Sequence, residues 1–395
     1  MKVLYITYWG LSEGLTSSTV IPHLKILASF DHIAAIDLCT IERVVAEQPV
    51  SYAIPKLTHH PLHSTNMRPG ILNKMLDFIR LPRMIARVVQ ERHPDRIICR
   101  GAMAGALGYL AHRKTGVPFH VESFEPHARY MLESGVWSSF DPRYLLQKIW
   151  EKRQKKYAAS LQPVAHNYRN QLIAEGLDPE RVKVIPCCTD LDYFKFDPER
   201  RDSTRAALGF DNTITGIYVG KFGGIYYDRE AFSVFKQAFD HFGPTFRLII
   251  LTPEPKTLVE QKLAQAGIPG EQAWVNLVPH TEVPHYLSAA DFAFSTIKPS
   301  ASRIYCSPVK NGEYWANGLP ILSTDGVGDD SEQIRRDRGG AVFDLQSSGD
   351  LQKAFEAIQS ILHQPDHRQR MADLANKYRS FDIARACYAA VHRLP

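Results

Sequence analysis

The sequence has few cysteines and no long apolar run, and both absences narrow the class of protein. Its six cysteines among 395 residues include no Cys-x-x-Cys pair, so neither a zinc site nor a dithiol redox centre is predicted. No run of about 18 apolar residues occurs, so no membrane-spanning helix is predicted. The apolar run near the N-terminus is too short for a signal peptide. We therefore expect a cytoplasmic protein with unpaired cysteines.

The charge is also modest. A net charge of +5 suits anionic small molecules or an anionic membrane surface, and it does not require nucleic acid as a partner. The sequence shows neither an RNA-binding signature nor zinc-finger spacing. The hydrophobic share of 44% and the charged share of 23% are ordinary for globular proteins. A chain of 395 residues with this composition predicts two domains.

The first half of the sequence alternates strand-like and helix-like segments. Apolar runs and helical periods follow one another at 2–8, 17–30, 33–39, 101–115 and 117–123. This alternation predicts a doubly wound parallel sheet, in which ligands bind at the carboxyl ends of the strands. Three loops follow such strand ends, namely Gly10–Gly14, Arg100–Gly101 and Glu122–Arg129. We expect the ligand of this half among them.

A second series of the same kind starts near residue 214. Strands are predicted at 214–219, 246–252, 274–278, 291–295 and 319–324. Helices are predicted at 229–242, 255–266, 283–290, 350–362 and 368–392, with another that begins at 311. The two halves thus share an architecture without sharing sequence. The charged, proline-containing stretch near 190–205 is the predicted linker.

Two segments of the second half are typical of an anion site. The first, Gly220-Lys-Phe-Gly-Gly224, follows a predicted strand, and its glycines allow backbone amides to approach an anion. Lys221 adds positive charge, although a plain turn would explain these residues equally well. In the second segment, Lys310 lies in the first turn of a helix that follows Pro308. Glu313 lies one turn further on, and the alternative for this pair is an exposed helical ion pair.

These segments, taken in order, resemble the retaining GT-B glycosyltransferases of glycosyltransferase family 4. The matching stretches are Val184–Phe194, Tyr218–Lys221, Tyr286–Ser295, Lys310–Ile321 and Gly326–Phe343. The resemblance implies an α/β GT-B fold, with two Rossmann-like, doubly wound parallel-sheet domains that face each other across a cleft. It implies an acceptor-binding domain at 1–190 and a donor-binding domain at 191–379. A terminal helix at about 380–395 is expected to pack back on the first domain.

The resemblance also implies roles for the donor site. Lys221 and Lys310 would stabilise the departing diphosphate of a UDP- or GDP-type sugar, and Glu313 would hold the ribose. Transfer would retain the anomeric configuration and would need no metal and no cofactor. One departure is that Tyr305 stands where the family has the first of two glutamates. The other predicted donor-binding residues are Gly220, Gly223, Gly224, Arg303, Ser307 and Pro308.

The acceptor is expected on the N-terminal half. Glu125 and His127 follow a predicted strand, and either side chain would orient the attacking hydroxyl or act as a base. The alternative is a capped loop with surface ion pairs. The other predicted acceptor-binding residues are Gly10, Glu13, Gly14, Glu122 and Arg129.

Two basic amphipathic segments, 72–92 and 143–157, predict either solvated helix faces or contact with anionic lipid headgroups. The function predicted is sugar transfer to a saccharide or lipid-linked acceptor in bacterial surface polysaccharide or glycolipid synthesis. The protein would be cytoplasmic, at most peripheral at the inner face of the cell membrane, and without a nucleic-acid partner. The alternatives are a nucleotide-sugar epimerase of the same fold and a non-catalytic scaffold protein.

Overall fold

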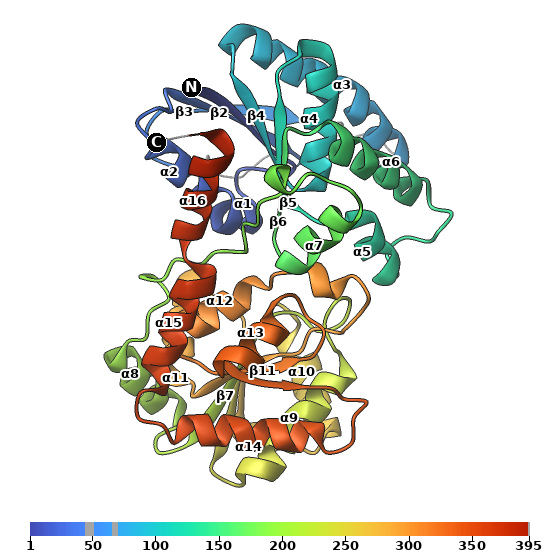
Figure 1. Cartoon of the computed structure of the whole chain (residues 1–395). Coiled ribbons are helices and arrows are strands. Elements are labelled where there is room, and N and C mark those ends of the chain that lie inside the picture. Colours follow the sequence, from blue (N-terminus) through green and yellow to red (C-terminus); the bar gives the residue numbers. More distant parts are fainter. Residues whose placement is uncertain (44–50, 65–69, 394–395) are drawn as a thin grey trace. The chain divides into compact units, whose positions relative to one another are not determined.

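Two six-stranded parallel sheets organise the chain (Figure 1). The computed structural model describes residues 1–43, 51–64 and 70–393. One unit comprises Met1–Pro186 with Phe381–Pro395, and the other comprises Cys187–Ser380. The sequence had placed the division at 190 and 379. Among the described residues, no helix combines the length and apolarity needed to cross a membrane.

The first unit has the strand order β3-β2-β1-β4-β5-β6. Its strands are β1 Lys2–Thr7, β2 Ala35–Glu42, β3 Leu57–His63, β4 Arg96–Arg100, β5 Phe119–Phe124 and β6 Ser160–Pro163. β1, β2, β4 and β5 are buried over most of their length, as expected for strands covered on both faces. The chain order reverses between β1 and β4. The carboxyl ends of these two strands therefore flank the crevice where such sheets bind ligands.

Helices cover both faces of this sheet. They are α1 Gly14–Thr19, α2 Ile21–Ala28, α3 Gly70–Arg92, α4 Ala102–Thr115, α5 His127–Glu133, α6 Pro142–Tyr157, α7 His166–Ala174 and α16 Phe381–His392. α4 approaches the sheet closely because of two glycines. A Cβ at Gly108 would lie 2.2 Å from Cys99 Sγ, and one at Gly105 would lie 2.9 Å from Val121 Cγ1. The small residues of this helix therefore serve packing.

The second unit has the order β12-β11-β10-β7-β8-β9, with the reversal between β10 and β7. Its strands are β7 Ile214–Val219, β8 Phe246–Leu251, β9 Ala273–Asn276, β10 Phe292–Ser295, β11 Ile321–Thr324 and β12 Gly340–Phe343. Its helices are α8 Pro198–Leu208, α9 Arg229–Phe242, α10 Lys256–Gln265, α11 Val283–Ala289, α12 Val309–Ala316, α13 Asp330–Asp337, α14 Asp350–Leu362 and α15 His367–Arg379. One apolar cluster is rich in phenylalanine and includes Phe235 and Phe294. The other includes Tyr314 and Trp315 of α12. α12 is thus fixed by its buried face.

Three predicted elements differ from the structure for local reasons. The segment 17–30 forms two helices, α1 and α2, because Pro22 lies in the first turn of α2 and cannot continue a preceding helix. The segment 368–392 is divided at Ser380, whose backbone is extended, into α15 and α16. Half of the predicted linker belongs to α8, because the Asp197 carboxylate accepts the first amides of that helix.

Candidate active site

Lys310 lies in the first turn of α12, and its buried ammonium nitrogen has no hydrogen-bond partner among the residues that the structure describes. Nζ lies 4.9 Å from the ring centre of Tyr218 and 4.3 Å from that of Tyr226. Burial lowers the pKa of Lys310 to about 7, against the opposite effect of the Glu313 carboxylate. A buried cation without a bonded anion is costly. The position is therefore suited to an anionic ligand.

Gly220 makes room for this lysine. A Cβ on Gly220 would lie 2.6 Å from Lys310 Nζ, and the residue has a φ of 146° that other residues rarely adopt. Its amide donates to the Leu251 carbonyl at 2.9 Å, so the amide continues the sheet ladder. The predicted place of Gly220 in the donor site thus rests on the space that it leaves for Lys310 rather than on its amide.

The loop after β7 carries the other predicted phosphate-binding groups. Lys221 is exposed, and its backbone carbonyl accepts a hydrogen bond from the Tyr218 hydroxyl. Gly223 and Gly224 both have positive φ values, 77° and 63°. The Gly223 amide lies 3.4 Å from the Tyr227 carbonyl, whereas Gly224 is exposed. The sequence grouped Lys221 with Lys310, but the structure gives the two lysines opposite environments.

Glu313, on α12, faces His280 rather than Lys310. Its Oε1 lies 3.6 Å from His280 Nε2, and the Glu313 hydrogen bond raises the pKa of that histidine. The exposed ring of Tyr193 stacks on His280 at 6.3 Å between ring centres. Within the described chain, no ion pair joins Glu313 to Lys310, so the alternative of a simple helical pair does not describe this arrangement. His280 and Tyr193 were not predicted as site residues.

The remaining predicted donor residues surround the start of α12. Arg303 and Tyr305 are buried in a 3-10 turn, and Pro308 precedes the first helical residue. The Ser307 hydroxyl accepts from the Cys187 amide at 3.1 Å and from the Arg379 guanidinium. This placement favours a structural role for Ser307 in fixing the helix start.

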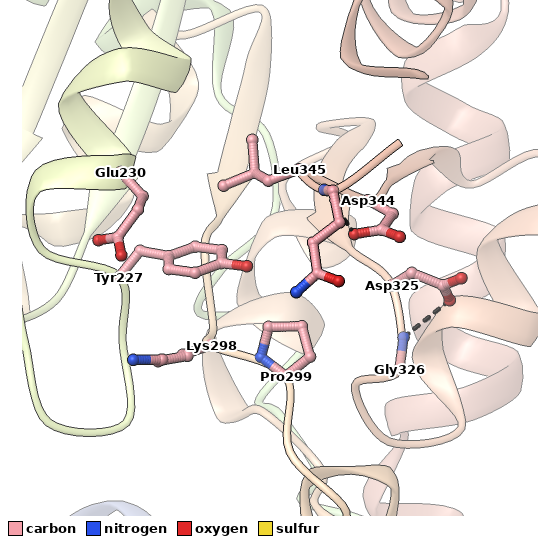
Figure 2. A pocket seen from close by; sticks show the side chains of 9 residues that line it. Tyr227, Glu230, Lys298, Pro299, Asp325, Gly326, Asp344 and Leu345 are labelled. Atoms are coloured by element: carbon pink, nitrogen blue, oxygen red, sulfur yellow. Dashed lines mark hydrogen bonds between the residues drawn. The ribbon is translucent and has the colours of Figure 1, made fainter. Parts of the chain in front are cut away.

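A pocket of about 560 Å³ opens at the carboxyl ends of β10, β11 and β12 (Figure 2). Tyr227, Glu230 and Lys298 lie on one side of it in the figure, and Asp325 and Asp344 lie on the other. The Asp325 carboxylate accepts from the Gly326 amide at 2.7 Å and pairs with Arg335 at 2.6 Å. This pocket was not predicted from the sequence. The sequence signal that could have indicated it is the polar residue that follows shortly after each of β10, β11 and β12.

In the first unit, Glu125 and His127 lie together after β5. His127 Nδ1 is 3.2 Å from Glu125 Oε1, and the histidine ring meets Trp137 edge to face. Burial lowers the pKa of His127, but the Glu125 hydrogen bond and the Glu125 and Glu151 carboxylates outweigh it, so the net pKa is raised. His127 is therefore biased toward its protonated, hydrogen-bond-donating form.

Glu122 belongs to an internal network instead of the surface. It is 1% exposed, and its carboxylate accepts from the Tyr5 hydroxyl at 2.7 Å and faces Arg100 at 3.4 Å. Tyr388 of α16 also bonds to it and contacts His23 at 2.8 Å. This placement favours a structural role for Glu122 in joining the C-terminal helix to the first sheet.

The other predicted acceptor residues also have internal partners. Gly10 is buried, and its amide donates to the Glu13 carboxylate at 2.8 Å. Gly14 is exposed at the start of α1 with open space around it. Arg129 pairs with Glu133 at 2.7 Å on the exposed side of α5. Of the predicted acceptor residues, Glu125 and His127 are the ones that form a half-buried acid–base pair.

Comparisons with known proteins agree with this architecture. Residues 45–188 match the family model described as a glycosyl transferase 4-like domain. The chain is similar to HepE of Anabaena in complex with UDP, with 13% identity, both chains fully covered and a TM-score of 0.70. It is similar to the lipopolysaccharide outer core galactosyltransferase WaaB, with 13% identity, coverage of 100% and 99%, and a TM-score of 0.69. UDP-GlcNAc 2-epimerase of Neisseria meningitidis, bound to UDP-GlcNAc, has 13% identity, full coverage of both chains and a TM-score of 0.63. No curated protein sequence matches the chain.

The two parallel-sheet units have the GT-B fold. The matched domain model indicates that the activity of this fold here is glycosyl transfer. The chain is a GT-B glycosyltransferase that resembles glycosyltransferase family 4, and the matched domain lies almost entirely in its first unit.

Proposed function

We propose that the chain transfers a sugar from a UDP- or GDP-type nucleotide sugar to a saccharide or lipid-linked acceptor. The observation that carries this proposal is the buried ammonium group of Lys310, to which no anion is hydrogen-bonded in the described part of the chain. It lies over Tyr218, a residue of β7, beside the point where the strand order reverses. Its partner would be the donor diphosphate. HepE, which has the same fold, binds UDP, and this supports a uridine nucleotide.

The reaction needs positive charge where the diphosphate departs. Groups fixed there stabilise the transition state more than the ground state, because negative charge grows as the glycosidic bond breaks. Lys310 would supply that charge from inside, with Lys221 and the amides at the start of α12 at the periphery. Glu313 would exchange its contact with His280 for the ribose hydroxyls.

For transfer to the acceptor, the proposed reaction retains the anomeric configuration and needs no metal. In such a scheme a donor phosphate oxygen takes the acceptor proton, so no side-chain base is needed. In this scheme His127 would orient the acceptor hydroxyl through a hydrogen bond and would not need to remove its proton. Glu125 would hold His127 in place for the acceptor hydroxyl.

The process we propose is bacterial surface polysaccharide or glycolipid synthesis at the inner face of the cell membrane. The similarity to WaaB, a lipopolysaccharide galactosyltransferase, supports this proposal. A nucleotide-sugar epimerase is the second candidate, because UDP-GlcNAc 2-epimerase has the same fold. Incubation with UDP-GlcNAc and no acceptor separates the two, since only an epimerase converts the sugar.

Calorimetry of UDP and GDP binding tests the donor site. We expect Lys310→Met and Glu313→Ala each to weaken binding by about tenfold or more, or about 1.4 kcal/mol. Lys256→Ala, which removes an exposed lysine of α10, is the matched control and should bind as the wild type does. Losses within about threefold in both site variants, about 0.7 kcal/mol, would show that the donor binds elsewhere. Turnover in EDTA and the anomeric NMR signal of the product then test metal dependence and retention.

A further inference from the structure

Helix α6 buries its polar residues and exposes its apolar ones. Its buried stripe consists of Gln147, Glu151 and Gln154. The Glu151 carboxylate accepts from the Ala128 amide at 2.8 Å and from Gln147 at 3.1 Å. The Gln154 amide donates to the Ala102 carbonyl at 2.9 Å. Hydrogen bonds therefore fix much of the inward face of this helix, and Leu145, Leu146 and Ile149 lie outside that face.

The outward face starts with large apolar side chains. Leu145, Leu146 and Ile149 are 48%, 46% and 50% exposed, and Phe140, just before the helix, is 89% exposed. Val136, in the preceding turn, is 55% exposed. These exposed apolar side chains lie in the first two turns of α6 and in the segment just before it. Such a group on a protein surface marks an interaction site.

Cations occupy the other end of the same face. Lys152 and Lys156 follow Leu145 and Ile149 after seven residues, which is two helical turns, so they lie along the same line. Lys148 and Arg153 are also exposed. Within the described residues, no carboxylate forms an ion pair with any of these four. The nearby Asp141 is paired with Arg143.

A neighbouring helix extends the basic surface. Phe78 of α3 stacks on Trp150 of α6 at 5.9 Å between ring centres, with the ring planes 9° apart. The next residue of α3, Ile79, is 50% exposed. Its outward cations are Arg80, Arg83 and Arg87. Figure 1 shows α3 and α6 on the same side of the first unit. The positive charge therefore covers two helices.

We propose that the α6 face, defined as Val136, Phe140, Leu145, Leu146 and Ile149 with Lys148, Lys152, Arg153 and Lys156, docks the first unit on an anionic lipid bilayer. The apolar side chains would enter the interfacial layer, and the cations would meet the headgroups. This rests on the membrane contact of the proposed function and assigns it a surface. A second copy fits less well, because a twofold contact would bring two sets of unpaired cations together.

Co-sedimentation of the full chain with vesicles tests the proposal. We expect strong binding to vesicles of equal parts phosphatidylcholine and phosphatidylglycerol and weak binding to phosphatidylcholine alone. The triple variant K152E/R153E/K156E should bind the anionic vesicles about tenfold or more weakly. The variant F140S/L145S/I149S should lose the binding that persists at high salt. L277S/K353E, which changes an exposed leucine and an exposed lysine of the second unit, is the matched control and should bind as the wild type does.

Two further measurements complete the test. In F140W, the added indole should be quenched by brominated lipids only in anionic vesicles. UDP calorimetry on every variant should be unchanged, which separates a failure of docking from a failure of the donor site. Equal binding by the wild type and both triple variants would overturn the proposal. A dimer in sedimentation velocity that F140S/L145S/I149S dissociates would also overturn it, because a second copy would then cover the face.

Discussion

The Lys310 ammonium group is buried beside the rings of Tyr218 and Tyr226, and because burial lowers its pKa, its charge depends on pH near neutrality. The pKa of about 7 means that the free protein carries a charged Lys310 below this pH and a neutral one above it. A bound diphosphate favours the charged form and raises the pKa. We expect the affinity for UDP-glucose to fall as pH rises above about 7, by up to about tenfold per unit. Calorimetry between neutral and alkaline pH measures this slope.

Lys310→Arg is the control for that slope, because a guanidinium stays charged across the range. Its binding should vary little with pH. The phosphates of UDP-glucose do not titrate there, so they add no slope of their own, and the arginine variant also reports any slope that the uracil ring contributes. A wild-type profile as flat as that of the arginine variant would show that Lys310 does not take up the proton.

Gly220→Ala, compared with a control glycine, should distinguish the loss of space beside Lys310 from the strain of a positive backbone φ. The added Cβ would meet Lys310 Nζ, so we expect loss of UDP binding of about tenfold in addition to destabilisation of about 1 kcal/mol. Gly209→Ala is the matched control. Gly209 also has a positive φ, 68°, but nothing lies within 4 Å of its Cβ position. The control should lose stability and keep its affinity, as measured by urea unfolding and calorimetry.

At the residue scale, the sequence predicted Lys310 and Glu313 as donor-site residues because helix spacing places them one turn apart on α12. It did not predict that Lys310 would face Tyr218 and Tyr226, since Tyr226 lies in a loop whose path depends on tertiary contacts. For Glu122, the sequence predicted a ligand contact, whereas the structure shows contacts within the protein. Its place after a strand suggested an acceptor contact, but Tyr388, from the far end of the chain, bonds to it.

At the element scale, α12, α13 and α15 meet around a buried ion pair. Arg379, the last residue of α15, pairs with Asp330, the first residue of α13, and Asp330 also accepts from Asn311 of α12 at 2.6 Å. Arg379→Met would leave the carboxylate buried without its cation, and we expect it to destabilise the second unit by about 3–5 kcal/mol. Arg335→Met breaks an exposed ion pair with Asp325, and we expect it to lower the free energy of unfolding by at most about 1 kcal/mol.

The pH dependence of Arg379→Met provides a second readout. Burial raises the pKa of Asp330 even with Arg379 present, and loss of the cation would raise it further. A carboxyl whose folded pKa is raised destabilises the fold as pH rises from its unfolded value through the folded value. The urea-unfolding deficit should therefore be larger at alkaline than at mildly acidic pH. A deficit independent of pH would point to lost packing instead.

The elements that periodicity missed are short, polar or at a sheet edge. β3 has the sequence Leu-Thr-His-His-Pro-Leu-His and lies beside β2 at the edge of the sheet formed by the described strands, so it needs no continuous apolar run. α8 is strongly charged and was interpreted as a linker, although Asp197 caps its start. Long amphipathic helices such as α9 and α14 have the predicted bounds, because their apolar faces determine both type and length.

At the scale of the whole molecule, the chain leaves the first unit at Pro186 and re-enters it at Phe381. α16 then supplies Tyr388 to the network around Glu122. Tyr388→Phe removes the bonds to His23 and Glu122, and we expect it to destabilise the first unit by about 1–3 kcal/mol. Hydrogen exchange should show faster opening of β1 and β5 with unchanged UDP affinity.

Tyr378→Phe is the matched control for that experiment. The Tyr378 hydroxyl donates to Asp337 near the surface of the second unit, so its loss should leave the first unit unaffected. Equal exchange in β1 and β5 for wild type and Tyr388→Phe would show that Glu122 does not depend on the terminal helix.

The sequence by itself determined the alternation of strands and helices, the two doubly wound units and the helix that carries Lys310 and Glu313. Apolar periodicity, glycines and caps act over a few residues, so they are readable locally. Tertiary structure alone decided which rings enclose Lys310, that Glu122 is buried by a helix from the other end of the chain, and that α6 presents its apolar side outward. These depend on residues far apart in sequence, and on whether hydrogen bonds or apolar contacts fill each interior space.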